Sequence, residues 1–132
     1  RALRERLLRA PALGDVGDER DRDSIGLTPE AQRILSDLDS RGWFQDYQHA
    51  ARLALAYAIR HGVPEGTTKG TETRWAAGNF DNTGEIRAAL AALFPECRTP
   101  VRLMEHLVNE GLRLIAVKLH SDEIGPGELI DG

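Results

Sequence analysis

The chain of 132 residues has few aromatic residues, a single cysteine and no long hydrophobic run. Aromatic residues make up 5% of the sequence, so the core must rest on aliphatic side chains and alanine, which favours packed helices. One cysteine, Cys97, excludes an internal disulfide framework. No apolar stretch approaches the roughly 20 residues of a membrane-spanning helix, and no signal-peptide-like segment follows the first arginines. We therefore expect a cytoplasmic protein with no membrane partner, which folds as one domain.

Basic charge is also limited, and lysine is nearly absent. The formal net charge is −4, and only two of the 17 basic residues are lysines. Residues 121–132 hold four acidic and no basic residues, so residues 1–120 balance at 17 basic against 17 acidic. This balance argues against a strongly basic nucleic-acid coat protein but allows a neutral body with one basic face. A GC-rich genome explains the preference for arginine over lysine. The functional alternative is bidentate contact of the arginines with phosphate or carboxylate groups.

Helix start and stop signals predict one short strand and four helices. Ile25 and Leu27 alternate with small residues, which is the period of a very short strand. Thr28-Pro29 then predicts a helix start, with a hydroxyl N-cap followed by proline in the first turn. Later helix starts are predicted at Asp46, at an Asn82–Glu85 capping box and at Thr99-Pro100. The expected helices span about 29–41, 46–60, 82–94 and 100–119.

Three segments of the chain differ in their expected organisation. Residues 1–21 read as a charged N-terminal segment and linker, 22–120 as a single helical domain, and 121–132 as an acidic flexible tail. The 46–60 helix has an apolar face so wide that it predicts packing on more than one side. Residues 63–81 form a long Gly- and Thr-rich stretch, which is expected to be a functional loop or to contain a short element.

No catalytic, cofactor-binding or metal-binding constellation is found in the sequence. The phosphate-binding patterns GxxxxGK[ST] and GxGxxG are absent, and the four histidines are scattered without an HExxH motif. His106 with Glu105 and Glu110 could form a metal half-site, but a solvated histidine on a charged helix face explains the pattern better. Cys97 lies in a turn whose local geometry does not favour pairing with His106. We expect a non-catalytic protein without a cofactor.

Residues 22–60 show the order short strand, helix, aromatic-containing turn, helix, which is typical of ribbon-helix-helix proteins. In that architecture the strands of two copies pair across a two-fold axis, and the ribbon enters the major groove. Arg22 and Ser24 would then face DNA. Asp46 would cap the second helix and repel a phosphate there, which argues against ordinary operator binding. The sequence thus predicts a mainly α, oligomeric fold with a ribbon-helix-helix-like core and two further helices.

Three short stretches between residues 25 and 119 resemble the DndE family, whose members elaborate a ribbon-helix-helix-like core with further helices. Their order and spacing carry more weight than any one of them. The stretches are Leu27-Thr28-Pro29-Glu30-Ala31, then Lys69-Gly70-Thr71-Glu72-Thr73-Arg74 followed by Thr83-Gly84-Glu85, and finally His106-Leu107 with Gly111.

The resemblance implies an accessory DNA-binding subunit of a bacterial DNA phosphorothioation system, in which sulfur replaces a non-bridging phosphate oxygen, or of a related antiphage defence or restriction-modification system. Implied partners are DNA, including nicked duplex, further copies of the chain as a dimer or tetramer, and other subunits of the complex. Lys69 and Arg74 are implied as the leading phosphate contacts, with Arg22 and Arg20 next. The ribbon interpretation adds Ser24.

Three other functions are alternatives to DNA binding. A protein–protein adaptor or scaffold of a defence complex would use the wide face of the 46–60 helix and the acidic tail. A ribbon-helix-helix antitoxin or transcriptional repressor is disfavoured by Asp46 and by the extra helices after Pro64. A small enzyme using Cys97 or the carboxylates near the long loop (Glu72, Asp81 and Glu85) is disfavoured, because their spacing shows no catalytic pair.

Overall fold

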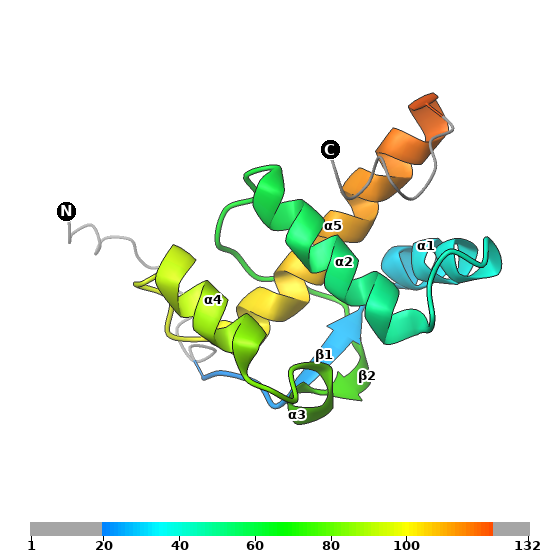
Figure 1. Cartoon of the computed structure of the whole chain (residues 1–132). Coiled ribbons are helices and arrows are strands. Elements are labelled where there is room, and N and C mark those ends of the chain that lie inside the picture. Colours follow the sequence, from blue (N-terminus) through cyan, green and yellow to red (C-terminus); the bar gives the residue numbers. More distant parts are fainter. Residues whose placement is uncertain (1–19, 123–132) are drawn as a thin grey trace.

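The computed structural model describes residues 20–122, which form a mainly helical body with one small sheet (Figure 1). Of the predicted N-terminal segment and acidic tail, only residues 20–21 and 121–122 are among those described, and the remainder lies outside them. Within residues 20–122, no helix combines the length and the apolar character needed to cross a membrane. The elements are β1 (Ser24–Leu27), α1 (Pro29–Ser40), α2 (Tyr47–Arg60), β2 (Glu72–Ala76), α3 (Ala77–Phe80), α4 (Glu85–Leu93) and α5 (Pro100–Asp122).

The starts of α1 and α2 confirm the predicted caps. Thr28 Oγ1 accepts a hydrogen bond from the Ala31 backbone N–H at 3.0 Å, and proline occupies the first turn of α1. Asp46 Oδ1 accepts from the His49 N–H at 2.8 Å. Each side chain satisfies an N–H group that the first helical turn leaves without a partner.

The start of α4 differs from the predicted Asn82–Glu85 capping box. Gly84 precedes the helix in the left-handed conformation, with φ at 80°. This turn brings the buried Asp81 carboxylate to the helix end, where its two oxygens accept from the N–H groups of Ile86 and Arg87 at 2.9 and 3.0 Å. The predicted cap was wrong because Asp81 lies one position further upstream and takes both bonds.

The start of α5 is capped by a residue from the beginning of the described chain. Asp21 accepts from the N–H groups of Val101 and Arg102 at 3.1 and 3.0 Å. Arg102 Nε also donates to the Arg20 carbonyl oxygen at 2.6 Å. Residues 20–21 are thereby fixed to α5.

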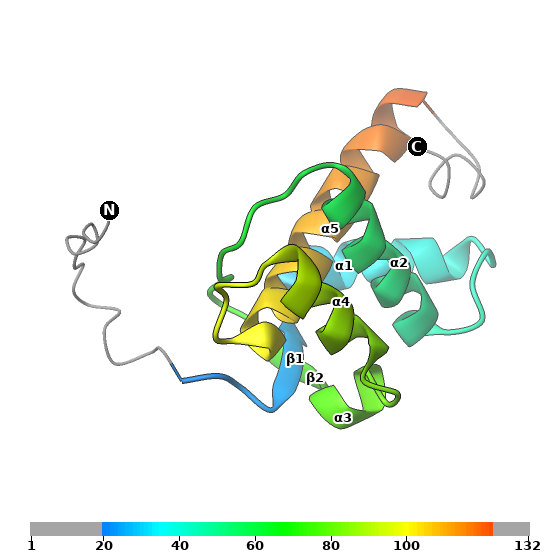
Figure 2. The same cartoon turned by 60° about the vertical axis from the view of Figure 1, so that its left-hand side comes forward.

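The core lies between α2 and α5, which pack side by side in the views of Figures 1 and 2. α2 also contacts α1, so the prediction that its wide apolar face packs on more than one side is confirmed. Gly111 of α5 sits directly against α2, where an added Cβ would lie 2.6 Å from the carbonyl carbon of Ala54. The hypothesis that Gly111 permits close helix packing is therefore confirmed.

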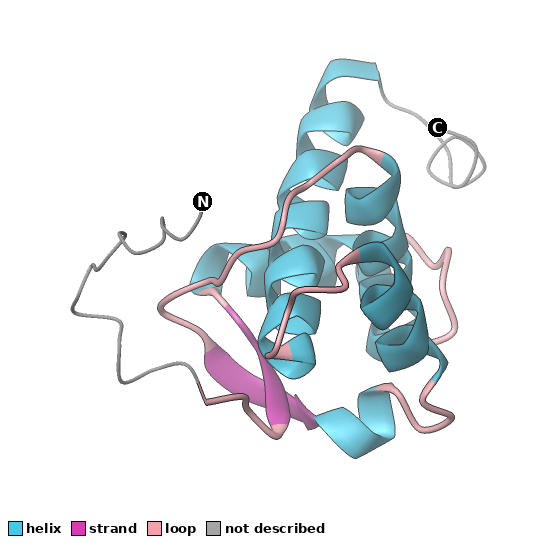
Figure 3. Ribbon diagram, turned by 90° about the vertical axis from the view of Figure 1, so that its left-hand side faces the viewer, coloured by secondary structure: helices cyan, strands magenta, loops and turns pink. Residues whose placement is uncertain are grey.

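The sheet contains a strand that the sequence did not reveal. Residues 63–81, expected as a loop, include β2 and α3, and β2 pairs antiparallel with β1. Figure 3 shows the two strands at one end of the helical body. The order strand, helix, turn, helix over residues 22–60 is confirmed, but in this chain β1 pairs with β2 rather than with a second copy.

The second edge of β1 is covered by α5. Glu105 Oε1 accepts from the Gly26 N–H at 2.8 Å, and Asn109 Nδ2 donates to the Gly26 carbonyl oxygen at 3.0 Å. Asn109 Oδ1 accepts from the Thr28 N–H at 2.9 Å. Both polar side chains are almost fully buried. Since β2 occupies one edge and α5 the other, β1 has no edge available for a further strand.

Candidate functional site

The candidate site is centred on Arg74, which is the extra residue of a β-bulge. Across the sheet, Ile25 is opposite Trp75 and Gly26 is opposite Thr73, so Arg74 has no partner in β1. A bulge bends the strand and redirects the side chain of the inserted residue. Here it places the guanidinium of Arg74 against the beginning of α2.

Two aromatic rings hold the Arg74 guanidinium. Its Cζ atom lies 4.5 Å from the ring centroid of Tyr47 and 5.4 Å from that of Trp75. Tyr47 is the first residue of α2, directly after the Asp46 cap, and Trp75 packs on Phe80 with ring centroids 5.6 Å apart. Such cation–π contacts hold the flat face of the guanidinium while its N–H donors lie in the plane.

The guanidinium of Arg74 differs from several other arginines in having no carboxylate partner among the described residues. Within residues 20–122, no carboxylate forms an ion pair or hydrogen bond with its guanidinium, whereas Arg22, Arg41 and Arg113 each pair with an acidic side chain. Planar N–H donors with no carboxylate partner suit bidentate contact to a phosphate. The arrangement therefore provides one fixed, available cation at the sheet end of the molecule.

Of the other predicted contacts, Ser24 lies next to β2, and Lys69 lies in the segment that precedes β2. The Ser24 hydroxyl lies 3.3 Å from that of Thr73, the residue before Arg74. Lys69 is exposed in the segment that leads into β2. Hydroxyl and ammonium groups of this kind contact phosphate oxygens in protein–DNA complexes.

Arg22 and Arg20 are placed differently, beside α5. Arg22 Nη1 lies 3.5 Å from the Oε2 atom of Glu105, whose side chain is only 2% exposed. The guanidinium of Arg22 thus balances a buried charge. Arg20 is exposed, and its carbonyl oxygen accepts the bond from Arg102. Tyr47 and Trp75 were not predicted as site residues, although an aromatic residue next to Arg74 was a usable signal.

His106 fastens the segment that carries Lys69 to α5. Its Nδ1 atom lies 2.9 Å from the hydroxyl of Thr68. Gly66 packs on the ring so closely that an added Cβ would lie 2.9 Å from Nε2. His106, which belongs to one of the stretches that resemble the DndE family, thus connects α5 to the segment before β2.

Protonation of His106 is expected to destabilise the fold. Burial lowers the pKa of His106 from its ordinary value of 6.5, against the opposing effects of the Glu110 charge and a hydrogen bond to the Thr67 backbone. The unfolded chain binds the proton more readily than the folded chain. The free energy of unfolding should therefore be highest above pH 6.5 and should decrease as the pH falls below it. Urea unfolding at several pH values measures this decrease.

A matched pair of variants assigns the pH effect. His106→Gln should flatten the pH dependence of stability below pH 6.5, whereas His49→Gln, at an exposed position, should leave it in place. An unchanged pH dependence in His106→Gln would show that other groups are responsible.

No metal centre is evident in the described part of the chain. Among residues 20–122, no three side chains of His, Cys, Asp or Glu lie close enough together to hold an ion. Glu105 points to β1, and the half-buried Cys97 lies with its Sγ atom 3.9 Å from the Thr99 hydroxyl. Comparison with protein-family models, curated proteins and solved structures gives no match.

Proposed function

We propose that the chain is a non-catalytic accessory subunit that contacts the DNA backbone in a bacterial DNA phosphorothioate modification system or a related defence system. The single observation that carries DNA contact is the Arg74 guanidinium, held on Tyr47 and Trp75 without a carboxylate partner in residues 20–122. The phosphorothioation context rests on the resemblance of three sequence stretches to the DndE family.

The proposed contact uses the sheet rather than a helix terminus. The N-terminus of α2 would be a ready phosphate site, but the Asp46 carboxylate already accepts from the His49 N–H there and would repel a phosphate. Arg74, Lys69 and the Ser24 hydroxyl instead supply donors from β2, the preceding segment and β1. With a net charge of −4, affinity would depend on these few contacts and not on a broad basic surface.

The double variant Lys69→Ala/Arg74→Ala should weaken DNA binding about tenfold or more at low salt, because it removes two charge-assisted phosphate contacts. The slope of log K against log salt should also become shallower by about 2, since each phosphate contact releases counterions. Fluorescence anisotropy with a labelled duplex over a salt series measures both quantities. Arg60→Ala/Arg87→Ala, which removes the same charge from the far end of α2 and from α4, is the control. Equal losses in the two double variants would contradict the assignment.

Gel-shift titration of intact, nicked and single-stranded DNA at two salt concentrations tests the proposal as a whole. Salt-sensitive binding with a preference for nicked duplex is the expected result. Failure to bind any of the three forms would contradict it and favour the adaptor alternative. Tight binding to one intact duplex sequence alone would favour a repressor.

A further inference from the structure

A polar pocket of about 310 Å³ is lined by the first turns of α2, the short helix α3 and the start of α4, which are labelled in Figures 1 and 2. It adjoins the Arg74 site, because consecutive residues of α2 contribute to the two: Tyr47 holds Arg74, and Gln48 lines the pocket. A pocket of this size admits a small molecule or a single group of a larger one. The other polar side chains that line it are those of Arg52, Asn79, Asp81, Asn82, Thr83 and Glu85.

The guanidinium of Arg52 is held in a defined orientation at this pocket. Its Nη1 atom donates to Gln48 Oε1 at 3.1 Å and to the Phe80 carbonyl oxygen at 3.2 Å, and its Cζ atom lies 5.8 Å from the centroid of the Phe80 ring. Among residues 20–122, no group accepts a hydrogen bond from its Nε and Nη2 atoms, and no carboxylate pairs with it. Arg52 therefore presents planar donors that are already positioned for an acceptor.

The pocket also contains acidic groups that Arg52 does not neutralise. Asp81 is buried, and its two oxygens accept from N–H groups at the start of α4. Glu85 is exposed and has no ion-pair partner in the described part of the chain. Two carboxylates beside one guanidinium disfavour a phosphate in this pocket. A neutral ligand with acceptors for Arg52 and donors for Glu85 is the better complement.

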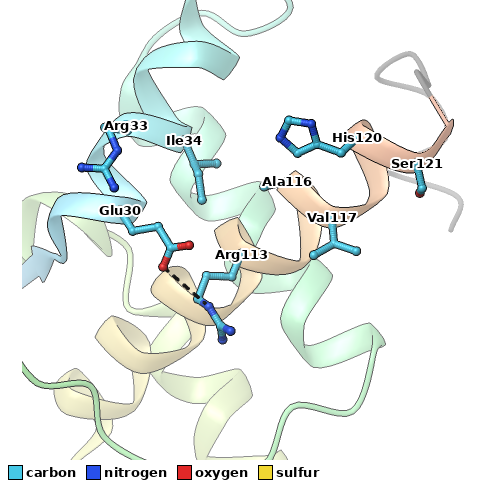
Figure 4. A pocket seen from close by; sticks show the side chains of 8 residues that line it. All are labelled: Glu30, Arg33, Ile34, Arg113, Ala116, Val117, His120 and Ser121. Atoms are coloured by element: carbon cyan, nitrogen blue, oxygen red, sulfur yellow. Dashed lines mark ion pairs between the residues drawn. The ribbon is translucent and has the colours of Figure 1, made fainter.

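The groove between α1 and α5 differs from this pocket, although it also contains both signs of charge (Figure 4). There the Nε atom of Arg113 lies 3.8 Å from Glu30 Oε1, and its Nη1 atom lies 2.6 Å from Glu110 Oε1. These charges are therefore already paired within the chain. Arg33, which is exposed at the same groove, provides a control position for Arg52.

Aromatic rings connect the pocket to the Arg74 site. Phe80, which contacts the Arg52 guanidinium, packs on Trp75 with ring centroids 5.6 Å apart. The Cζ atom of Arg74 lies 5.4 Å from the centroid of the same Trp75 ring. A DNA strand whose phosphate contacts Arg74 can therefore bring a neighbouring base to the pocket.

We propose that the pocket between α2, α3 and α4 binds an unpaired nucleobase, with guanine as the best fit. The O6 and N7 acceptors of guanine suit the free donors of Arg52, and its ring N–H and amino group suit the Glu85 carboxylate. The base belongs either to a DNA strand held by Arg74, in which case the inference rests on the proposed function, or to a free nucleotide. In a strand, the base must be unstacked to enter the pocket.

Fluorescence anisotropy of the full chain with single-stranded oligonucleotides tests the base contact. One strand is an oligothymidylate with a single central guanine, and the other has an abasic residue at that position. The wild-type protein should bind the guanine strand about tenfold more tightly, because Arg52 and Glu85 gain hydrogen bonds to the base. Contacts with the backbone are common to both strands, so the ratio of the two affinities reports the pocket.

Three variants assign this ratio to the pocket. Arg52→Ala should bring the ratio close to one, and Glu85→Ala, at an exposed position, should lower it about threefold or more. Arg33→Ala removes the same charge as Arg52→Ala outside the pocket and should leave the ratio unchanged. Circular dichroism checks that the variants keep their helices. Since Glu85→Ala removes a negative charge, it should not weaken binding of the abasic strand, and an equal loss for both strands would overturn the role of Glu85.

The outcomes separate the pocket from the proposed backbone contact. Equal binding of the guanine and abasic strands by the wild type would overturn the pocket and leave the Arg74 contact in place. If the protein binds neither strand, the proposed function fails, and NMR titration with deoxyguanosine monophosphate decides the pocket. Shift changes at Arg52 and Glu85 that disappear in Arg52→Ala would then assign it to a free nucleotide. The absence of shift changes would overturn the nucleobase pocket as well.

Discussion

Replacing Gly111 with alanine is expected to destabilise the protein by about 3 kcal/mol, although alanine is the better helix former. The added methyl group would meet the backbone of α2, where the carbonyl carbon of Ala54 lies 2.6 Å and its Cα atom 3.2 Å from the new Cβ. Backbone atoms in a helix cannot turn aside as a flexible side chain can. Relief therefore requires α2 and α5 to move apart, which loosens the main interface of the core.

The matched control for Gly111 is Gly78 of α3. An added Cβ at Gly78 meets nothing within 4 Å, and its φ angle is not positive. Gly78→Ala should therefore change the free energy of unfolding by no more than about 1 kcal/mol, in the stabilising direction. Urea denaturation of the two variants gives the comparison. A Gly111→Ala protein as stable as the wild type would show that the helices are not in backbone contact.

Asn109→Ala is expected to cost a similar amount, about 3 kcal/mol, through lost hydrogen bonds rather than overpacking. The Asn109 amide donates to the carbonyl oxygens of Gly26 and Glu105 at 3.0 and 2.7 Å and accepts from the Thr28 N–H at 2.9 Å. The side chain is 1% exposed, so water does not readily replace it. Truncation leaves backbone groups of β1 and of the α1 start without partners.

Asn79→Ala serves as the control, because Asn79 is exposed on α3. Its free energy of unfolding should stay close to that of the wild type. Amide hydrogen exchange adds a local measurement, since the Thr28 amide, which donates to Asn109 Oδ1, should lose protection in Asn109→Ala before the core helices do. Unchanged protection at the Thr28 amide would mean that Asn109 does not cover this end of β1 in solution.

Local signals in the sequence were enough to predict α1, α2, α4 and α5, but not the short α3 and not every helix end. Thr28 and Asp46 cap α1 and α2 from the adjacent position, where a sequence pattern can reveal them. Asp21 caps α5 from 80 residues away, and such a partner cannot be recognised from spacing. Asp81 was missed because the left-handed backbone at Gly84 turns the chain. This turn lets a carboxylate upstream of the expected capping box reach the first N–H groups of α4.

The strand β2 and the aromatic stack were missed for a related reason. No residue of β2 is fully buried and only Trp75 packs on the core, so Glu72–Ala76 lacks the alternation of apolar and polar residues that identifies a half-buried strand. Its pairing depends on β1, which is far away in the sequence. Arg74 could be singled out by resemblance and charge, but Tyr47 comes from α2, and only the fold brings it to Arg74.

The sealing of β1 by Glu105 and Asn109 has a consequence for biosynthesis. These hydrogen bonds join residues that are 79 to 83 positions apart in the sequence. During synthesis, β1 therefore leaves the ribosome long before α5 does. During that interval the strand edge is open to pairing with other chains, which is the usual hazard of unprotected edges. Productive folding must therefore await α5, and chains that end before Asn109 are expected to aggregate.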